Sequence, residues 1–172
     1  IGLFVPQSGV VDYKEVVQSY EKDFIEMGGE IKYIEEIKQI ENKNGLKSIT
    51  GNKYTYNCEF LINCAGLFSD EIAKLDNMSP SVKIIPFRGE YYKISNTKNK
   101  ILNNMIYPLA DPDLPFLGIH LTKTANGDIE AGPNAVLAFS KEGYKWTDIN
   151  FVDLTKVLTF PGMLKLGKKY FK

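Results

Sequence analysis

Turn-forming dipeptides cut the middle of the chain into runs that are too short for helices. Asn44-Gly45 and Gly51-Asn52 interrupt alternating apolar and polar residues over positions 34–60. Asparagine and glycine favour the left-handed backbone conformations that tight turns between antiparallel strands require. The sequence therefore predicts a small antiparallel meander in this region.

Helical periodicity precedes the meander. Asp12 and Glu15 have the spacing of a capping box. The apolar residues that follow at helical spacing are Val16, Val17, Tyr20, Phe24 and Met27. A helix is expected over about 13–27, ended by Gly28-Gly29, and the alternation over 30–34 predicts a strand.

The run FLINCAG at 60–66 reads as a buried strand that ends in a turn of small residues. A helix is expected to begin next, with Ser69 as its cap. Such a turn lets backbone approach a nucleotide or its phosphates, because a helix N-terminus beyond it offers free N–H groups. The alternative is a plain connection between a strand and a helix.

The second half of the chain is predominantly β in pattern, with proline and glycine turns. Strands are expected near 82–87, 89–95, 104–108, 116–123 and 128–132. Two helices close the chain, near 151–159 and 162–171, with Asp148 or Asn150 as a cap for the first. These elements predict the α+β class.

Charge and composition exclude several functions. The chain has 21 Lys+Arg and 21 Asp+Glu, so no basic surplus favours nucleic-acid binding. No run of about 18 apolar residues predicts a membrane span, although peripheral contact stays open. Cys58 and Cys64 are too few for a disulfide framework or zinc cage. A reducing, cytoplasmic setting is expected, and the opening at Ile1 without Met predicts that the chain begins inside something longer.

Arg88 and Gly89 stand together inside a β pattern, in the segment PFRGEYY. Glycine in a strand often marks the close approach of a ligand or a bulge. The Arg88 guanidinium can hold a carboxylate with two parallel hydrogen bonds. A surface pair between arginine and glutamate is the other reading.

The only histidine of the chain, His120, lies in a stretch rich in proline and glycine. Histidine can act as a general base near neutral pH, although a lone histidine in a strand is often structural. Asp111 and Asp113 lack the partners and spacing of a metal site and are expected to form turns. No metal site is predicted.

Several segments in this order resemble the L-2-hydroxyglutarate dehydrogenases and oxidases. They are SGVVDY at 8–13, INCAGLFSD at 62–70, PFRGEYY at 86–92, PFLGIHLT at 115–122 and AGPNAVLAFSKEGY at 131–144. These enzymes belong to the FAD oxidoreductases that resemble D-amino-acid oxidase. The resemblance implies an antiparallel substrate domain and a Rossmann-like FAD domain. Residues 1–80 would contribute to an incomplete FAD domain, 81–150 would form the substrate sheet, and 151–172 would be C-terminal helices.

The resemblance also implies FAD as the cofactor and oxidation of L-2-hydroxyglutarate to 2-oxoglutarate as the reaction. His120 is the expected base. The residues expected to bind this small 2-hydroxy acid are Arg88, Tyr91, Tyr92 and Tyr107. Those expected near the cofactor are Ile37, Cys64, Ala65, Gly66 and Gly89. Oxygen or a quinone would accept the electrons, with peripheral inner-membrane association left open.

The chain departs from the family pattern because it lacks G-x-G-x-x-G. That fingerprint would precede Ile1, and a completing strand and helix would follow Lys172. The chain is therefore expected to be a central portion that is inactive in isolation. Two alternatives remain: an enzyme of the same group that oxidises glycerol 3-phosphate or an amino acid, and a truncated module without catalytic activity.

Overall fold

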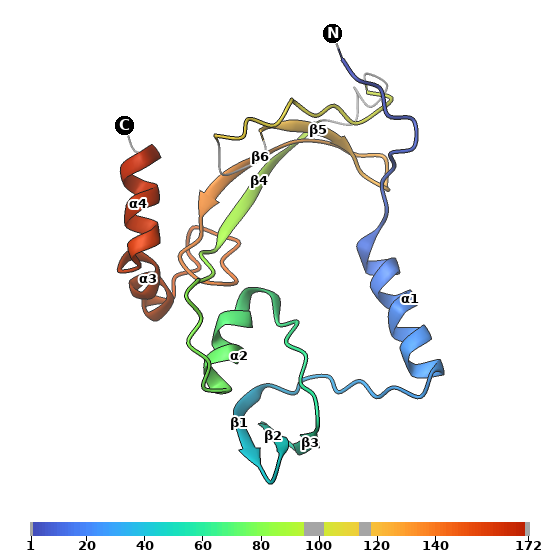
Figure 1. The fold of residues 1–172 in the computed structure, drawn as a ribbon. Coiled ribbons are helices and arrows are strands. Elements are labelled where there is room, and N and C mark those ends of the chain that lie inside the picture. The colour runs from blue at the N-terminus through green and yellow to red at the C-terminus, as the bar shows by residue number, and fades with distance from the viewer. Residues whose placement is uncertain (1, 95–101, 114–117, 171–172) are drawn as a thin grey trace. The chain divides into compact units, whose positions relative to one another are not determined.

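The structure is a computed structural model that describes residues 2–94, 102–113 and 118–170. The chain forms two compact units, each assembled from two stretches of sequence. Unit 1 comprises Ile1–Ile31 and Gly89–Val136, and unit 2 comprises Lys32–Arg88 and Leu137–Lys172. Figure 1 labels their helices and strands. The described residues form four helices and two small antiparallel sheets, which is the α+β class.

Unit 1 begins with α1 (Tyr13–Glu26), which confirms the predicted N-terminal helix. The Asp12 side chain caps it by accepting a hydrogen bond of 2.9 Å from Lys14 N. Gly28 ends it with φ +89°, a conformation that glycine adopts without steric cost. The predicted strand over 30–34 is wrong, because Ile34 has a positive φ of 55° that interrupts extended backbone.

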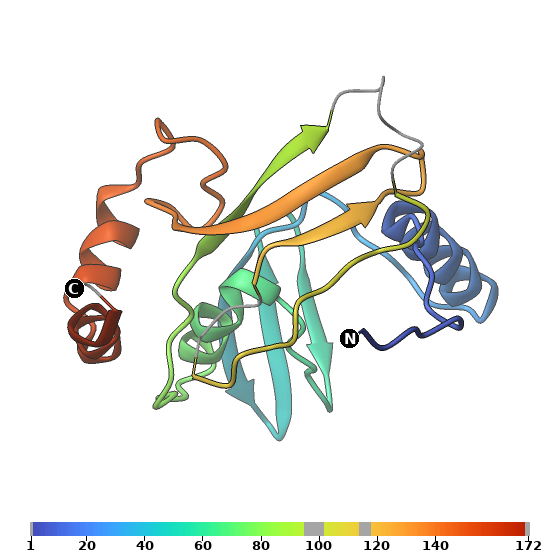
Figure 2. The same ribbon diagram turned by 90° about the horizontal axis from the view of Figure 1, so that it is seen from above.

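The sheet of unit 1 contains β4 (Phe87–Ile94), β5 (His120–Lys123) and β6 (Ile129–Leu137) in the order β4-β6-β5 (Figure 2). The ends of β4 and β6 at 87–88 and 137 are counted with unit 2. Strands β5 and β6 are antiparallel, and an isolated bridge between Ile106 and Leu121 continues the sheet. Leu102 and Ile129 are buried in this unit.

The predicted strands of this half met different outcomes. The strand near 128–132 is confirmed and extends to Leu137, and the one near 89–95 begins two residues earlier. The expected strand at 82–87 is wrong up to residue 86, and that at 104–108 is reduced to the Ile106 bridge. Part of the expected strand at 116–123 lies outside the described residues.

Unit 2 contains the predicted meander. Its strands are β1 (Ile37–Lys43), β2 (Leu46–Gly51) and β3 (Thr55–Cys58), in that order. Asn44 and Gly45 have positive φ angles of 52° and 83°, as the turn between β1 and β2 requires. Ile40 and Ile49 are partners across the two strands, and both are buried. The turn dipeptides therefore predicted this sheet correctly.

A 3-10 turn, η1 (Gly66–Phe68), leads into α2 (Ser69–Leu75) and confirms the expected helix start. Ser69 is the first helical residue rather than the cap, and its hydroxyl donates to Gly66 O at 2.8 Å. The buried strand expected at 60–62 is wrong: Phe60 and Ile62 are 85% and 83% exposed. Hydrophobic composition predicted burial there, but no strand of the described residues pairs with this segment.

Unit 2 ends with α3 (Phe151–Leu158) and α4 (Pro161–Tyr170), close to their predicted bounds. Of the two cap candidates, Asn150 caps α3, because its side chain accepts from Val152 N and Asp153 N. Asp148 instead accepts from the backbone of Tyr144 and Lys145. Within the described ranges, no helix has the length and apolar character needed to cross a membrane.

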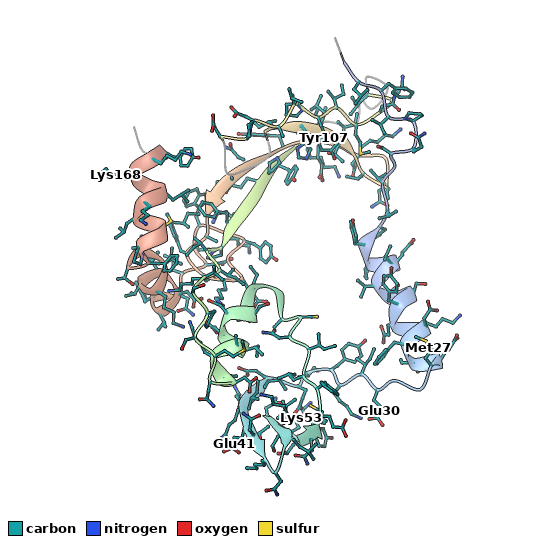
Figure 3. The ribbon with its side chains drawn as sticks, in the orientation of Figure 1. Met27, Glu30, Glu41, Lys53, Tyr107 and Lys168 are labelled. Carbon is teal, nitrogen blue, oxygen red and sulfur yellow. The ribbon has the colours of Figure 1, made fainter. Side chains whose placement is uncertain are left out.

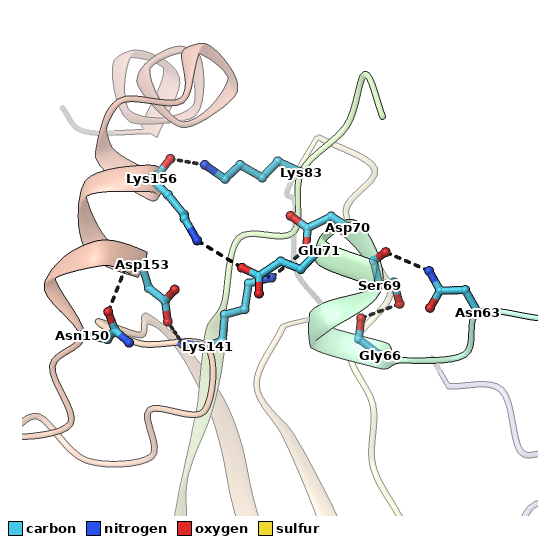
Figure 4. A network of polar contacts seen from close by, with 10 residues as sticks. All are labelled: Asn63, Gly66, Ser69, Asp70, Glu71, Lys83, Lys141, Asn150, Asp153 and Lys156. Atoms are coloured by element: carbon cyan, nitrogen blue, oxygen red, sulfur yellow. Dashed lines mark hydrogen bonds and ion pairs between the residues drawn. The ribbon is translucent and has the colours of Figure 1, made fainter. Parts of the chain in front are cut away.

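A buried ion pair connects α2 with the segment before α3. Lys141 Nζ lies 2.6 Å from Asp70 Oδ1 and 3.4 Å from Glu71 Oε1 (Figure 4). Burial raises the pKa of Asp70, but the hydrogen bond and charge of Lys141 outweigh it, so the pKa is lowered overall. The pKa of Glu71 is lowered in the same way, with burial opposed by Lys141 and Lys156. The ionised carboxylates therefore stabilise the fold.

The cap of α3 can be tested by Asn150→Ala. We expect the free energy of unfolding to fall by about 1 kcal/mol, because two backbone N–H groups lose their acceptor. Denaturant unfolding of the whole protein measures this, with the exposed Asn57→Ala as a control that stays within about 0.5 kcal/mol. An unchanged value for Asn150→Ala would show that water replaces the cap.

Acid should weaken unit 2 through the two carboxylates. Their folded pKa values lie below the ordinary 3.8 of Asp70 and 4.5 of Glu71. The stabilisation is therefore complete above those ordinary values and is lost as pH falls through the lower folded ones. Urea unfolding from neutral pH to about pH 3 should show a shallower acid decline in Asp70→Asn. An equal slope would contradict this assignment.

Candidate functional site

Three aromatic side chains lie together in unit 1: Tyr91 on β4, Tyr107 on the bridged segment and His120 on β5. The rings of Tyr107 and His120 are stacked, with centroids 4.5 Å apart and planes 25° apart. The rings of Tyr91 and His120 meet edge to face, with their centroids 6.2 Å apart. The structure thus brings together three of the residues that sequence predicted for substrate and catalysis. Tyr107 is labelled in Figure 3.

Glycines on β4 and β6 make room for the Tyr91 ring. Gly132 pairs with His120 across β5 and β6, and a Cβ at Gly132 would lie 2.6 Å from the Tyr91 ring. A Cβ at Gly89 would lie 3.0 Å from Pro133 and 3.2 Å from the same ring. Both positions therefore have a steric reason for glycine within the chain itself. For Gly89, this reason does not depend on a cofactor.

The environment of His120 fixes which ring nitrogen can act as a base. Its Nδ1 lies 3.2 Å from Gly118 O. Because a carbonyl oxygen only accepts, this contact requires the proton on Nδ1, which leaves Nε2 of the neutral ring with its lone pair. The Tyr107 hydroxyl donates to Met105 Sδ at 3.8 Å. The cluster can therefore present an oriented base.

Tyr92 is not part of this cluster. It follows Tyr91 on β4, so the two side chains leave opposite faces of the strand, and Tyr92 is 77% exposed.

A pocket of about 520 Å³ lies beside Tyr107. Its lining also includes Lys123 and residues between positions 3 and 10 of the N-terminal segment. Sequence reasoning missed this pocket because distant segments form it.

Arg88 lies in unit 2 and is buried, with 7% of its surface exposed. Its guanidinium carbon is 4.4 Å from the centre of the Trp146 ring, and Trp146 meets Phe139 edge to face at 5.9 Å. Stacking on an aromatic face suits the planar guanidinium group. The alternative interpretation of Arg88, as part of a surface pair with a glutamate, does not fit its buried position. Trp146 was missed, although it is the only tryptophan of the chain.

The turn at 63–69 in unit 2 is held by its own polar side chains (Figure 4). Asn63 Oδ1 accepts from Ala65 N at 3.1 Å, and Asn63 Nδ2 donates to Ser69 O at 2.9 Å. The bond from Ser69 to Gly66 closes the turn at its other end. Gly66 adopts a positive φ of 53° in this turn, a conformation that favours glycine. The turn contains the predicted cofactor residues Cys64, Ala65 and Gly66.

The turn has the free space that a ligand approaching its backbone would need. Apart from Gly66 and its two chain neighbours, no described residue has a heavy atom within 4 Å of a Cβ built on Gly66, and Cys64 is exposed. The first turn of α2 carries Asp70 and Glu71, whose carboxylates are paired with Lys141. The turn therefore has room beside its backbone for part of a dinucleotide such as FAD.

The remaining predicted cofactor residue, Ile37, opens β1 and pairs with Gly51. Its side chain is partly buried. Among the residues that the structure describes, no group of three His, Cys, Asp or Glu side chains could hold a metal ion. Asp111 forms the turn expected of it, since its Oδ1 accepts from Asp113 N at 2.9 Å.

Comparison with known proteins gives a consistent relationship. Residues 1–162 match the family model described as FAD dependent oxidoreductase. The chain is 46% identical over 171 residues to L-2-hydroxyglutarate dehydrogenase of Indibacter alkaliphilus, covering 99% of this chain and 43% of that protein. The corresponding protein of Escherichia coli K12 is 41% identical over 172 residues, with 99% and 41% covered.

The human protein named L-2-hydroxyglutarate dehydrogenase, mitochondrial, is 37% identical over 178 residues, covering 96% of this chain and 38% of that protein. The chain thus spans about two fifths of the length of the curated relatives it matches. Because the family match extends over almost all of its length, the chain belongs to the FAD-dependent oxidoreductase family.

Proposed function

We propose that the whole protein oxidises L-2-hydroxyglutarate to 2-oxoglutarate with FAD. The observation that carries this proposal is the similarity, along nearly the entire chain, to proteins named L-2-hydroxyglutarate dehydrogenase. The cluster around His120 adds a chemical reason, because oxidation of a hydroxyl group needs a base for its proton.

The proposal assigns separate roles to the parts of the chain. Residues 81–150 would supply the antiparallel substrate sheet, and 1–80 would supply elements of a Rossmann-like FAD domain, with helices at 151–172. The sheet β4-β6-β5 supports the first assignment, and the open turn at 63–66 supports the second.

In the reaction, His120 Nε2 takes the hydroxyl proton while C2 becomes a carbonyl carbon. The stack with Tyr107 and the hydrogen bond to Gly118 O hold the imidazole in one orientation, which would keep Nε2 directed at the substrate hydroxyl. When bound, FAD supplies the acceptor for the hydride that leaves C2. Tyr91 and Tyr107 would position the substrate beside His120, while Arg88 and Tyr92 remain predictions as carboxylate partners.

The proposed cofactor contacts are with the backbone. Cys64, Ala65 and Gly66 would contact FAD from the turn, and Ile37 from the start of β1. Gly89 keeps its proposed place near the cofactor, although its own neighbours already favour glycine. We further propose a cytoplasmic or peripheral inner-membrane location, with oxygen or a quinone as the electron acceptor.

The first test is the absorbance of the whole protein. We expect the spectrum of oxidised flavin, and we expect anaerobic L-2-hydroxyglutarate to bleach it while the D enantiomer does not. Bleaching by glycerol 3-phosphate or an amino acid instead would assign another substrate of the same chemistry. A folded, colourless protein would support a module without catalytic activity.

The second test is His120→Asn. Asparagine can still donate to Gly118 O but offers no basic nitrogen, so bleaching by L-2-hydroxyglutarate should slow by at least about a hundredfold. Stopped-flow absorbance measures the rate, and the exposed Tyr144→Phe serves as the unchanged control. A rate close to that of the unsubstituted protein would remove His120 from the mechanism.

A further inference from the structure

We propose that Lys141 is a positioning residue for the turn at 63–66, acting through the first turn of α2. The inference rests on the proposed function for the role of that turn in holding FAD. The juxtaposition itself lies entirely within unit 2.

Lys141 reaches α2 as a buried cation. Its side chain is 6% exposed, and that of its partner Asp70 is 5% exposed. Its Nζ also lies 3.4 Å from Glu71 Oε1 and 5.2 Å from the centre of the Phe68 ring. Lys141 therefore contacts three residues of one segment: Phe68 at the end of η1, and Asp70 and Glu71 in the first turn of α2.

The backbone of Lys141 is itself anchored. Its N–H donates to Asp153 Oδ2 in α3 at 3.1 Å. A second ion pair joins α2 and α3, because Lys156 Nζ of α3 lies 3.3 Å from Glu71 Oε1 of α2. Lys83 also donates a hydrogen bond to the Lys156 carbonyl oxygen. The ammonium group is thus held at the end of a fixed segment.

From α2, the hydrogen bonds of Ser69 and Asn63 pass this constraint to the turn. Ser69 is adjacent to Asp70, so a shift of the α2 start would move both Ser69 O and Ser69 Oγ. Those atoms bond to Asn63 Nδ2 and Gly66 O, which flank Cys64 and Ala65 (Figure 4). The position of the cofactor turn therefore depends on where Lys141 holds Asp70.

Stability alone does not require a charged pair here. Replacement of a buried ion pair by apolar residues of similar volume is often neutral or stabilising, whereas removal of one partner is destabilising. An ion pair does fix the position of α2 more narrowly than an apolar contact, because Nζ and Oδ1 must stay near 2.6 Å. This difference separates positioning from stability in an experiment.

The test uses deflavinated whole protein and two measurements: FAD affinity by flavin fluorescence, and amide hydrogen exchange of the 62–70 segment. For Lys141→Met we expect FAD to bind on the order of tenfold more weakly, the equivalent of about 1.4 kcal/mol, and the segment to exchange faster. Lys141→Arg should restore both values, because arginine keeps the charge and the donors.

Two controls remove the effect of stability. Asp12→Ala removes the cap of α1 in unit 1 and leaves the Lys141 network of unit 2 intact, so it should lower the melting temperature but leave FAD affinity and segment exchange unchanged. The double variant Asp70→Leu with Lys141→Met should regain stability, yet it should keep the weak FAD binding and the fast exchange.

The outcomes separate this inference from the proposed function. Unchanged exchange and affinity in Lys141→Met, or full recovery in the apolar double variant, would overturn the positioning role. If the unsubstituted protein binds no FAD while Lys141→Met alone accelerates exchange at 62–70, the positioning of the turn stands and the proposed function falls.

Discussion

A lysine ammonium group that is almost fully removed from water needs a carboxylate, and Lys141 has two within reach. The geometry of unit 2 depends on this requirement. Asp70 and Glu71 lie in the first turn of α2, so their pairing with Lys141 holds the start of that helix in place. Asp153 and Lys156 extend the same polar network into α3. Among the described residues of this unit, the buried apolar ones are Ile40, Ile49, Ala138 and Val157, and the polar network adds the contacts that join α2 to α3.

Unit 1 is organised by shape instead of charge. The ring of Tyr91 needs the missing side chains of Gly89 and Gly132, and the ring of Tyr107 covers His120. Glycine exposes backbone in a strand, and an aromatic ring on a neighbouring strand restores the lost contact. The same packing orients the only histidine of the chain.

Local signals predicted local structure well. The cap at Asp12, the stop at Gly28 and the turn at Asn44-Gly45 each depend on near neighbours, and the structure confirms them. The strand expected at 60–62 failed because strand formation needs a partner that composition cannot reveal. The sequence and its resemblance to a family suggested His120 and the turn at 64–66 as candidates, and these stay predictions, whereas only coordinates reveal the stack on Tyr107 or the contacts of Lys141. Those contacts join residues that are distant in sequence.

The separation of 71 residues between Asp70 and Lys141 has a consequence for how the chain acquires its form. Synthesis from the N-terminus produces the carboxylate long before the ammonium group, and the intervening chain includes the stretch 89–136 of unit 1. Closing so long a loop costs conformational entropy that only the completed contacts can offset. We therefore expect the α2 start to acquire its final geometry late, when the second stretch of unit 2 emerges from the ribosome.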